Sequence, residues 1–285
     1  MAKQTIIVET AKELSLRCGM IAIADKVSGE EALRPIEDVR TLIVDNHSVR
    51  ITVPLINELV RNNVCIVYCD EKHMPASMMM DLESNSLQSK RFQAQLSATK
   101  PVNKQLWKQI VEAKIRNQSR LLEQLGKGER LLAKYYSSVK SNDTTNREGA
   151  AARIYWKVLL GKDFVRDRYG TPPNALLNYG YTLLRAAMAR SIMNAGLLPT
   201  VGIFHKNRYN AFPLADDMME PFRPFVDRKV MQLHGRGADS VCKETKQELL
   251  ELFYSDITES ALTLAATTLS GVYEGSNNIV AFPKL

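Results

Sequence analysis

Three side chains of matched chemistry lie in three unusually polar segments of this sequence. They are Glu148 in TNREG (residues 145–149), His205 in GIFHKN (202–207) and Glu220 in DDMMEPFRP (216–224). Two carboxylates and one imidazole supply the oxygen and nitrogen ligands that suit Mg²⁺ or Mn²⁺. Such a site keeps coordination positions open for a phosphate, and phosphodiester chemistry at a metal ion needs no protein nucleophile. The combination predicts a divalent-metal site that acts on DNA.

Glu148 and His205 each have a structural interpretation as well. Glu148 lies in the first turn of a helix predicted from about residue 146 to 160. There it would complement the helix dipole or form a capping box with Thr145. His205 is expected on a loop or at a helix start, and a single histidine is more often structural than a ligand.

Glu220 has two possible positions in the secondary structure. It is the third helical residue after a capping Asp217, or it precedes a helix that begins at Pro221. In either case it can form an ion pair with Arg223, three positions further on. Glu148, His205 and Glu220 are each a weak signal when taken alone, so the prediction of a metal site rests on all three together.

A second set of polar residues lies on a predicted helix over residues 174–195. This helix is apolar almost all round and is expected to be the buried axis of its domain. Asn178, Tyr181 and Arg185 follow the spacing i, i+3 and i+7, which places them on one stripe. A buried arginine needs an anionic partner, which could be a structural carboxylate, a phosphate or a carboxylate of the metal site.

The chain is basic, and cations surround the candidate ligands. The 285 residues contain 38 Lys and Arg and 31 Asp and Glu, a net charge of +7, with a pI near 9.2. This balance favours a polyanionic partner through counterion release. The candidate contacts to the DNA backbone are Arg147, Arg153, Lys206, Arg208 and Arg223. For each of them an ordinary solvated surface is the alternative.

The first 80 residues differ from the remainder of the chain. Short apolar or branched stretches at residues 5–8, 16–24, 40–44 and 64–68 predict strands. One helix is expected after Thr52, with Pro54 in its first turn and Asn62 and Asn63 at its end. These elements predict a small N-terminal β domain, residues 1–80, whose sheet carries one helix.

A polar segment then separates this β domain from a helical domain. Residues 81–89 lack a sustained period and are small and polar, which is typical of a linker. Beyond them, helical spacing occurs at residues 90–98, 104–122, 130–137, 147–160, 174–195 and 244–253. We therefore predict an α+β chain with a larger all-α domain over residues 90–285.

The sequence also limits the cellular setting. The N-terminus lacks the apolar core of a signal peptide, and no run approaches the roughly 20 apolar residues of a membrane span. The four cysteines have no paired CxxC spacing, so neither a disulfide framework nor a structural zinc site is indicated. A cytoplasmic location is expected, with no membrane partner.

Four blocks of the sequence resemble the CRISPR-associated integrases of the Cas1 family. They are TNREG (145–149), LNYGY (177–181), GIFHKN (202–207) and DMMEPFRPFVD (217–227). The resemblance extends over nearly the whole chain and is nearest to the type II branch. It implies that Glu148, His205 and Glu220 hold Mg²⁺ or Mn²⁺ and are catalytic. Glu220 replaces the aspartate of many relatives, as in other type II members.

The family motifs also imply supporting residues and an activity. Asp217 matches a further acidic position, as a residue that supports the ligands or as an alternative ligand, and Asn178, Tyr179 and Arg185 match the helical block. The implied function is spacer acquisition, in which the 3′-hydroxyls of a short DNA fragment attack phosphodiesters of the CRISPR repeat. This reaction is a metal-dependent transesterification, with an associated DNA endonuclease activity.

The resemblance further implies an assembly. Family members form homodimers through the β domain, and two dimers flank a dimer of the small adaptation partner Cas2. Further partners are the incoming fragment, the leader-repeat DNA, the type II effector nuclease and, in one subtype, a ring-shaped accessory protein. Two other functions compete with integration: a metal-dependent nuclease for branched DNA, and a non-catalytic DNA-binding scaffold.

Overall fold

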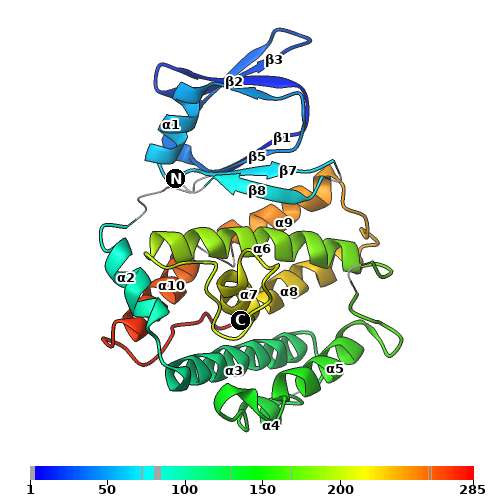
Figure 1. Ribbon diagram of the computed structural model, residues 1–285. Helices are drawn as coiled ribbons and strands as arrows, with labels where there is room; N and C mark the ends of the chain where they lie inside the picture. Colours follow the sequence, from blue (N-terminus) through cyan, green and yellow to red (C-terminus); the bar gives the residue numbers. More distant parts are fainter. Residues whose placement is uncertain are drawn as a thin grey trace. The chain divides into compact units, whose positions relative to one another are not determined.

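The chain divides into two units, Met1–Leu82 and Glu83–Leu285 (Figure 1). The computed structural model describes residues 4–71, 73–79, 85–128, 130–167, 169–255, 257 and 259–285, with the side chains of 254, 255 and 259 excepted. The first unit is rich in strands and the second is largely helical. The predicted α+β class is confirmed.

Two four-stranded sheets, rather than one, build the N-terminal unit. The first has the order β1 (Gln4–Val8), β5 (Val39–Val44), β7 (Cys65–Cys69) and β8 (Pro75–Met79). The second has the order β4 (Glu31–Pro35), β3 (Met20–Asp25), β2 (Lys12–Arg17) and β6 (Arg50–Ile51). The first three strands of the first sheet run parallel, and β8 is antiparallel to β7. The prediction of a single sheet was therefore wrong.

The stretch at residues 16–24, predicted as one strand, is a hairpin between β2 and β3. Cys18 and Gly19 have positive φ angles of 50° and 74° and join the two strands. A two-residue loop with positive φ at both positions matches the twist of antiparallel strands and closes a tight hairpin. The apolar residues on either side had concealed this reversal.

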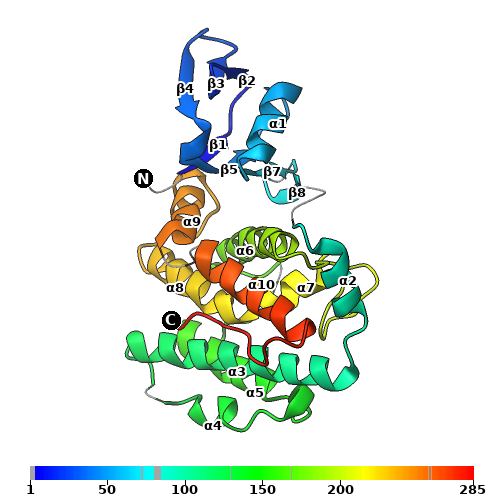
Figure 2. The same ribbon diagram turned by 90° about the vertical axis from the view of Figure 1, so that its left-hand side faces the viewer.

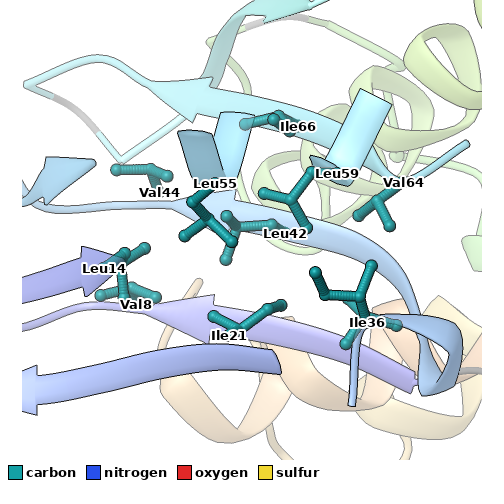
Figure 3. Close-up of a cluster of buried hydrophobic side chains, with 11 residues drawn as sticks. Val8, Leu14, Ile21, Ile36, Leu42, Val44, Leu55, Leu59, Val64 and Ile66 are labelled. Carbon is teal, nitrogen blue, oxygen red and sulfur yellow. The ribbon is translucent and has the colours of Figure 1, made fainter. Parts of the chain in front are cut away.

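The helix α1 (Val53–Arg61) and the faces of both sheets form the core of this unit. Pro54 lies in its first turn, and the helix ends before Asn62 and Asn63, as predicted. Thr52 precedes the helix, but its hydroxyl makes no capping hydrogen bond. Leu55 and Leu59 are fully buried among side chains of both sheets (Figure 3). Each buried leucine contributes about 1.5–3 kcal/mol of hydrophobic free energy.

The second unit contains helices of very different lengths. The longer ones are α2 (Gln88–Leu96), α3 (Lys100–Gln124), α5 (Arg147–Leu160), α6 (Asn174–Asn194), α8 (Arg223–His234), α9 (Lys243–Ser255) and α10 (Glu259–Tyr273). The shorter ones are α4 (Ala133–Tyr136), α7 (Pro213–Met219) and the 3₁₀ turns η2 (Ser141–Asp143) and η3 (Glu220–Phe222). Residues 81–84 of the predicted linker lie outside the described residues, and positions 88 and 89 belong to α2.

Two long helices, α3 and α6, organise the helical unit. The helix α6 packs against α7, α8, α9 and α10, and its apolar residues are buried, as expected of a domain axis. The helix α3 packs against α5, η2, η3 and α8. The segment α7–η3–α8 therefore lies between α3 and α6 (Figures 1 and 2). This arrangement brings η3 and the start of α5 to the same side of α3.

Several helical predictions need correction. The predicted helix over residues 130–137 contains only the single turn α4. The helices α7 and α10 were not predicted, and α8 was expected only as part of a helix that is capped by Asp217 or begins at Pro221. Prolines at positions 213, 221 and 224 obscured α7 and the start of α8, although each lies in the first turn of its helical segment, where proline is tolerated. None of the described helices is both long and apolar enough to cross a membrane.

Candidate active site

A lysine that sequence analysis did not single out connects the two predicted carboxylate ligands. Nζ of Lys114, on α3, lies 2.6 Å from Oε1 of Glu148 and 2.6 Å from Oε2 of Glu220. The side chain of Lys114 is 11% exposed, that of Glu148 24% and that of Glu220 5%. The structure thus brings Glu148 and Glu220, 72 positions apart in the sequence, to one buried ammonium group.

Glu148 occupies the first turn of α5, as predicted, but its helix is capped differently. Asn146, with a left-handed backbone, is the N-cap, and its side chain accepts a hydrogen bond from the backbone N–H of Gly149. Asp143 accepts hydrogen bonds from the N–H groups of Arg147 and Glu148. The predicted capping box with Thr145 is therefore wrong. Because other residues satisfy the helix start, the carboxylate of Glu148 is free to face Lys114.

Glu220 lies in the 3₁₀ turn η3, between α7 and α8. Asp217 is an internal residue of α7 and Pro221 lies within η3, so both predicted helix starts were wrong. The predicted ion pair with Arg223 is present, because Nη2 of Arg223 lies 3.0 Å from Oε1 of Glu220. Burial opposes ionisation of Glu220, but the charges of Arg223 and Lys114 outweigh it and lower its pKa.

His205 lies on a loop that Asp217 holds in place. The buried Asp217 carboxylate accepts hydrogen bonds from the backbone N–H groups of Ile203 and Phe204, and its Oδ1 lies 2.5 Å from Nδ1 of His205. The pKa of His205 is raised, chiefly by this hydrogen bond to Asp217, although burial acts in the opposite direction. The nearby charges of Glu220 and Glu148 also raise it.

Close packing fixes the position of the histidine loop. The ring of Phe204 stacks on the buried Trp107, with 4.2 Å between centroids and 3° between planes. The imidazole of His205 meets Trp107 edge-on at 5.7 Å. A Cβ atom at Gly202 would lie 2.3 Å from the carbonyl oxygen of His205, so only glycine allows this approach.

The donor set suits a divalent metal ion. Oε2 of Glu220 is buried and makes no hydrogen bond within the described part of the chain, although Lys114 lies close to it. Nδ1 of His205 faces Asp217, an arrangement that orients Nε2 for a metal in many proteins. As they stand, however, no three His, Cys, Asp or Glu side chains among the described residues converge closely enough to hold an ion. Lys114 stands between the two carboxylates instead.

The predicted supporting residues have distinct partners. Asn178 accepts a hydrogen bond from Arg166 at 2.7 Å, and Tyr179 is buried. Arg185 pairs with Asp216 at 2.8 Å and is 36% exposed, so it is half-buried rather than fully buried. The anionic partner that the structure gives it is the carboxylate of Asp216.

An acidic residue that sequence analysis did not single out, Asp227, lies near Arg223. Asp227, on α8, accepts hydrogen bonds from the hydroxyls of Tyr155 and Tyr181. Burial raises the pKa of Asp227 to about 6. The guanidinium of Arg223 lies over the Tyr181 ring, 4.8 Å from its centroid, and this contact connects Asp227 to the partner of Glu220. The polar stripe on α6 was a signal of such a partner, because Tyr181 belongs to it.

The predicted cationic residues differ in their accessibility. Arg153, Lys206 and Arg208 are exposed, and Arg208 lies over the Tyr209 ring. The Nε atom of Arg147 is buried without a hydrogen bond among the described residues. Arg223 is engaged by Glu220. Lys206 and Arg208 closely follow His205 in the sequence, and the exposed cations leave their charge available to an anion.

A strand-rich N-terminal unit and a helical unit with buried carboxylates and a buried lysine next to a partly exposed histidine define a two-domain α+β protein with a candidate metal site. The chain belongs to the Cas1 family: the model for "CRISPR associated protein Cas1" matches residues 5–241. It is 34% identical over 261 residues to a CRISPR-associated endonuclease Cas1 of Neisseria meningitidis serogroup C (strain 8013), covering 90% of this chain and 85% of that relative.

Two solved structures share the fold. One is a casposase bound to integration product, with a TM-score of 0.82 and 22% identity over 99% of this chain and 93% of that chain. The other is a Cas6-RT-Cas1–Cas2 complex, with a TM-score of 0.71 and 17% identity over 97% of this chain and 35% of that chain. At these identities the likeness concerns the fold alone.

Proposed function

We propose that this protein is a divalent-metal-dependent DNA integrase and endonuclease of CRISPR adaptation. Its role would be to join the 3′-hydroxyl ends of short DNA fragments to the CRISPR repeat. The observation that carries the proposal is the gathering of Glu148 and Glu220 at Lys114, next to a histidine oriented by Asp217, in a Cas1 family member. The Neisseria relative is named an endonuclease, and the casposase with this fold is bound to an integration product.

Glu148, His205 and Glu220 would hold Mg²⁺ or Mn²⁺, because their oxygen and nitrogen donors fit either ion. When bound, the ion would lower the pKa of the attacking hydroxyl and neutralise charge on the phosphate. Asp217 would keep His205 oriented, and Arg223 would keep Glu220 ionised.

The proposed reaction conserves the number of phosphodiester bonds. The 3′-oxygen of the fragment forms a bond to a phosphorus atom of the repeat, and the bond from that phosphorus to its original 3′-oxygen breaks. The attacking hydroxyl loses its proton, and the leaving oxygen gains one. With water as the attacking group, the same displacement would cut DNA, which accounts for an associated endonuclease activity.

The partners would be the DNA fragment, the leader-repeat DNA, a second copy of this chain and Cas2. The net charge of +7 and the exposed Arg153, Lys206 and Arg208 suit contacts to DNA phosphates. A structure of the same fold is a complex that contains Cas2. Dimerisation through the N-terminal β unit is part of the proposal.

One observation favours the non-catalytic scaffold. Lys114 already compensates both carboxylates, as expected of a structural ion cluster that requires no metal. A scaffold would bind DNA in a salt-dependent manner and form no product with any metal ion.

A strand-transfer assay tests these functions against one another. A supercoiled CRISPR plasmid, a short 3′-hydroxyl duplex and Cas2 are incubated with the wild type, His205→Ala or His234→Ala, with Mn²⁺ or EDTA. His234 is a matched control, because it also pairs with an aspartate, Asp239, but lies at the end of α8. Joined product that requires Mn²⁺ and is lost only in His205→Ala supports the integrase. Free 5′-phosphate ends without joining indicate a nuclease, and binding without any product indicates the scaffold.

A further inference from the structure

Lys114 is placed between two acidic groups rather than beside one. Its ammonium contacts Oε1 of Glu148 and Oε2 of Glu220 at the same distance, 2.6 Å. The three side chains come from α3, α5 and η3, three separate elements that pack together. A single cation therefore holds together two carboxylates that the chain itself does not connect.

The charges explain why these carboxylates stay close together. Glu220 is 5% exposed and Glu148 24%, so water screens their mutual repulsion poorly. Arg223 compensates Glu220 through Oε1, on the other side of the carboxylate. Without Lys114, Glu148 would face Glu220 with no cation between them.

The contact of Lys114 to Glu220 also affects the ionisation of this carboxylate. Burial opposes ionisation of Glu220, but the charges of Arg223 and Lys114 outweigh it and lower its pKa. An ion that coordinates Oε2 of Glu220 would therefore have to take over the charge compensation that Lys114 provides there.

We infer that Lys114 is a positioning residue that holds Glu148 and Glu220 at the place of a divalent ion and that the ion must displace to bind. The inference rests on the proposed function, because it requires that Glu148 and Glu220 are metal ligands. The ammonium and the ion compete for the same two oxygen atoms. The flexible four-carbon stem of lysine allows the charged group to withdraw without movement of α3.

Lys114 should therefore affect the stability of the metal-free protein and its metal affinity in opposite directions. Lys114 stabilises the metal-free protein by compensating two carboxylates, and it weakens metal binding because the ion must replace it. Its removal should therefore have opposite effects on the two quantities. An ordinary structural ion pair would lower stability on removal and leave metal affinity unchanged or weakened.

The test compares the wild type with Lys114→Met and Lys114→Gln. Lys108→Met is the matched control, because Lys108 is on the same helix but is more exposed and pairs with Glu112, at 3.7 Å. Mn²⁺ affinity is measured from the electron paramagnetic resonance signal of free Mn²⁺. Thermal unfolding is followed with and without Mn²⁺.

Both Lys114 variants should bind Mn²⁺ about tenfold more tightly than the wild type, a difference of about 1.4 kcal/mol. Without metal they should also unfold at a lower temperature than the wild type. Addition of Mn²⁺ should raise their unfolding temperature by more than it raises that of the wild type. Lys108→Met should match the wild type. Should Lys114→Met fail to fold, Lys114→Gln decides the question, because its neutral amide can still donate hydrogen bonds to the carboxylates.

The outcomes separate this inference from the proposed function. If the wild type binds Mn²⁺ but the Lys114 variants bind it equally or more weakly, the inference alone is overturned. If the wild type binds no Mn²⁺, or if His205→Ala binds it as the wild type does, the proposed metal site is overturned as well. Tighter binding by the variants, with affinity lost in His205→Ala, supports both.

Discussion

His205 and Asp217 form a hydrogen-bonded pair in which the buried carboxylate also anchors the backbone of the histidine loop. The side chain of Asp217 is 0% exposed, whereas that of His205 is 44% exposed. The aspartate is thus a rigid internal support, and the histidine keeps an accessible edge. This division of roles matches the carboxylate–histidine pairs that orient metal ligands.

Asp217→Asn should weaken the site while Glu148, His205 and Glu220 all remain. The amide retains the size of the side chain but carries no charge to orient the imidazole of His205. We expect Mn²⁺ affinity or strand transfer to fall about 10- to 100-fold. Asp216→Asn is the control, because Asp216 is the neighbouring acid and pairs with Arg185 instead. Equal effects of the two substitutions would show that Asp217 has no special role.

Gly202→Ala should displace the histidine loop. The new Cβ would lie 2.3 Å from the carbonyl oxygen of His205 and 2.9 Å from Cβ of Pro213, so the backbone must move. Overpacking of this kind lowers the free energy of unfolding by about 1–3 kcal/mol. Urea denaturation measures this loss, and the strand-transfer assay measures the accompanying loss of activity. At Gly235 the nearest atom to a new Cβ, the carbonyl oxygen of Met231, would lie 3.2 Å away. Gly235→Ala should therefore have a much smaller effect on stability and on strand transfer.

Asp227 should make the folded state less stable as the pH rises from about 4 to about 6. Its folded pKa is about 6, above the value near 3.8 expected in the unfolded chain, so the folded state binds the extra proton in this window. The free energy of unfolding therefore falls with rising pH, by up to about 1.4 kcal/mol per pH unit. Asp227→Asn should lack this contribution.

Urea denaturation of the wild type and Asp227→Asn at several values between pH 4 and pH 7 measures this effect. The difference between the two proteins isolates Asp227 from the other titrating groups. Its Tyr155 and Tyr181 partners remain in both proteins. A difference that stays constant across the pH range would contradict the prediction.

Lys206 and Arg208 should contribute to DNA affinity without sequence preference. Both are exposed and lie just after His205 in the sequence. Replacement of either by alanine should weaken binding to every duplex alike and reduce the slope of log K against log salt by about 1. Fluorescence anisotropy over a salt series measures this slope. Lys26→Ala, in the loop between β3 and β4, is a control for a general change in net charge. A sequence-dependent loss would indicate base contacts instead.

Much of the architecture was predictable because it depends on local patterns. The limits of α1 and α5 followed from Pro54, the paired asparagines and the polar loop before residue 147. The hairpin at Cys18 and the short proline-containing helices were missed, because their signals are weak over a few residues. The division into two sheets depends on long-range strand pairing, such as β1 with β5, which no local pattern specifies.

The sequence by itself determined the chemistry available to this protein: two carboxylates, a histidine, surrounding cations and membership of the Cas1 family. Only the tertiary structure decided which groups meet. In the sequence Lys114 is one of many lysines on predicted helices, and only the folded structure places it between Glu148 and Glu220. The physical reason is that residues on α3, α5 and η3 become neighbours through helix packing. The charge balance of a buried site depends on those neighbours rather than on the order of the chain.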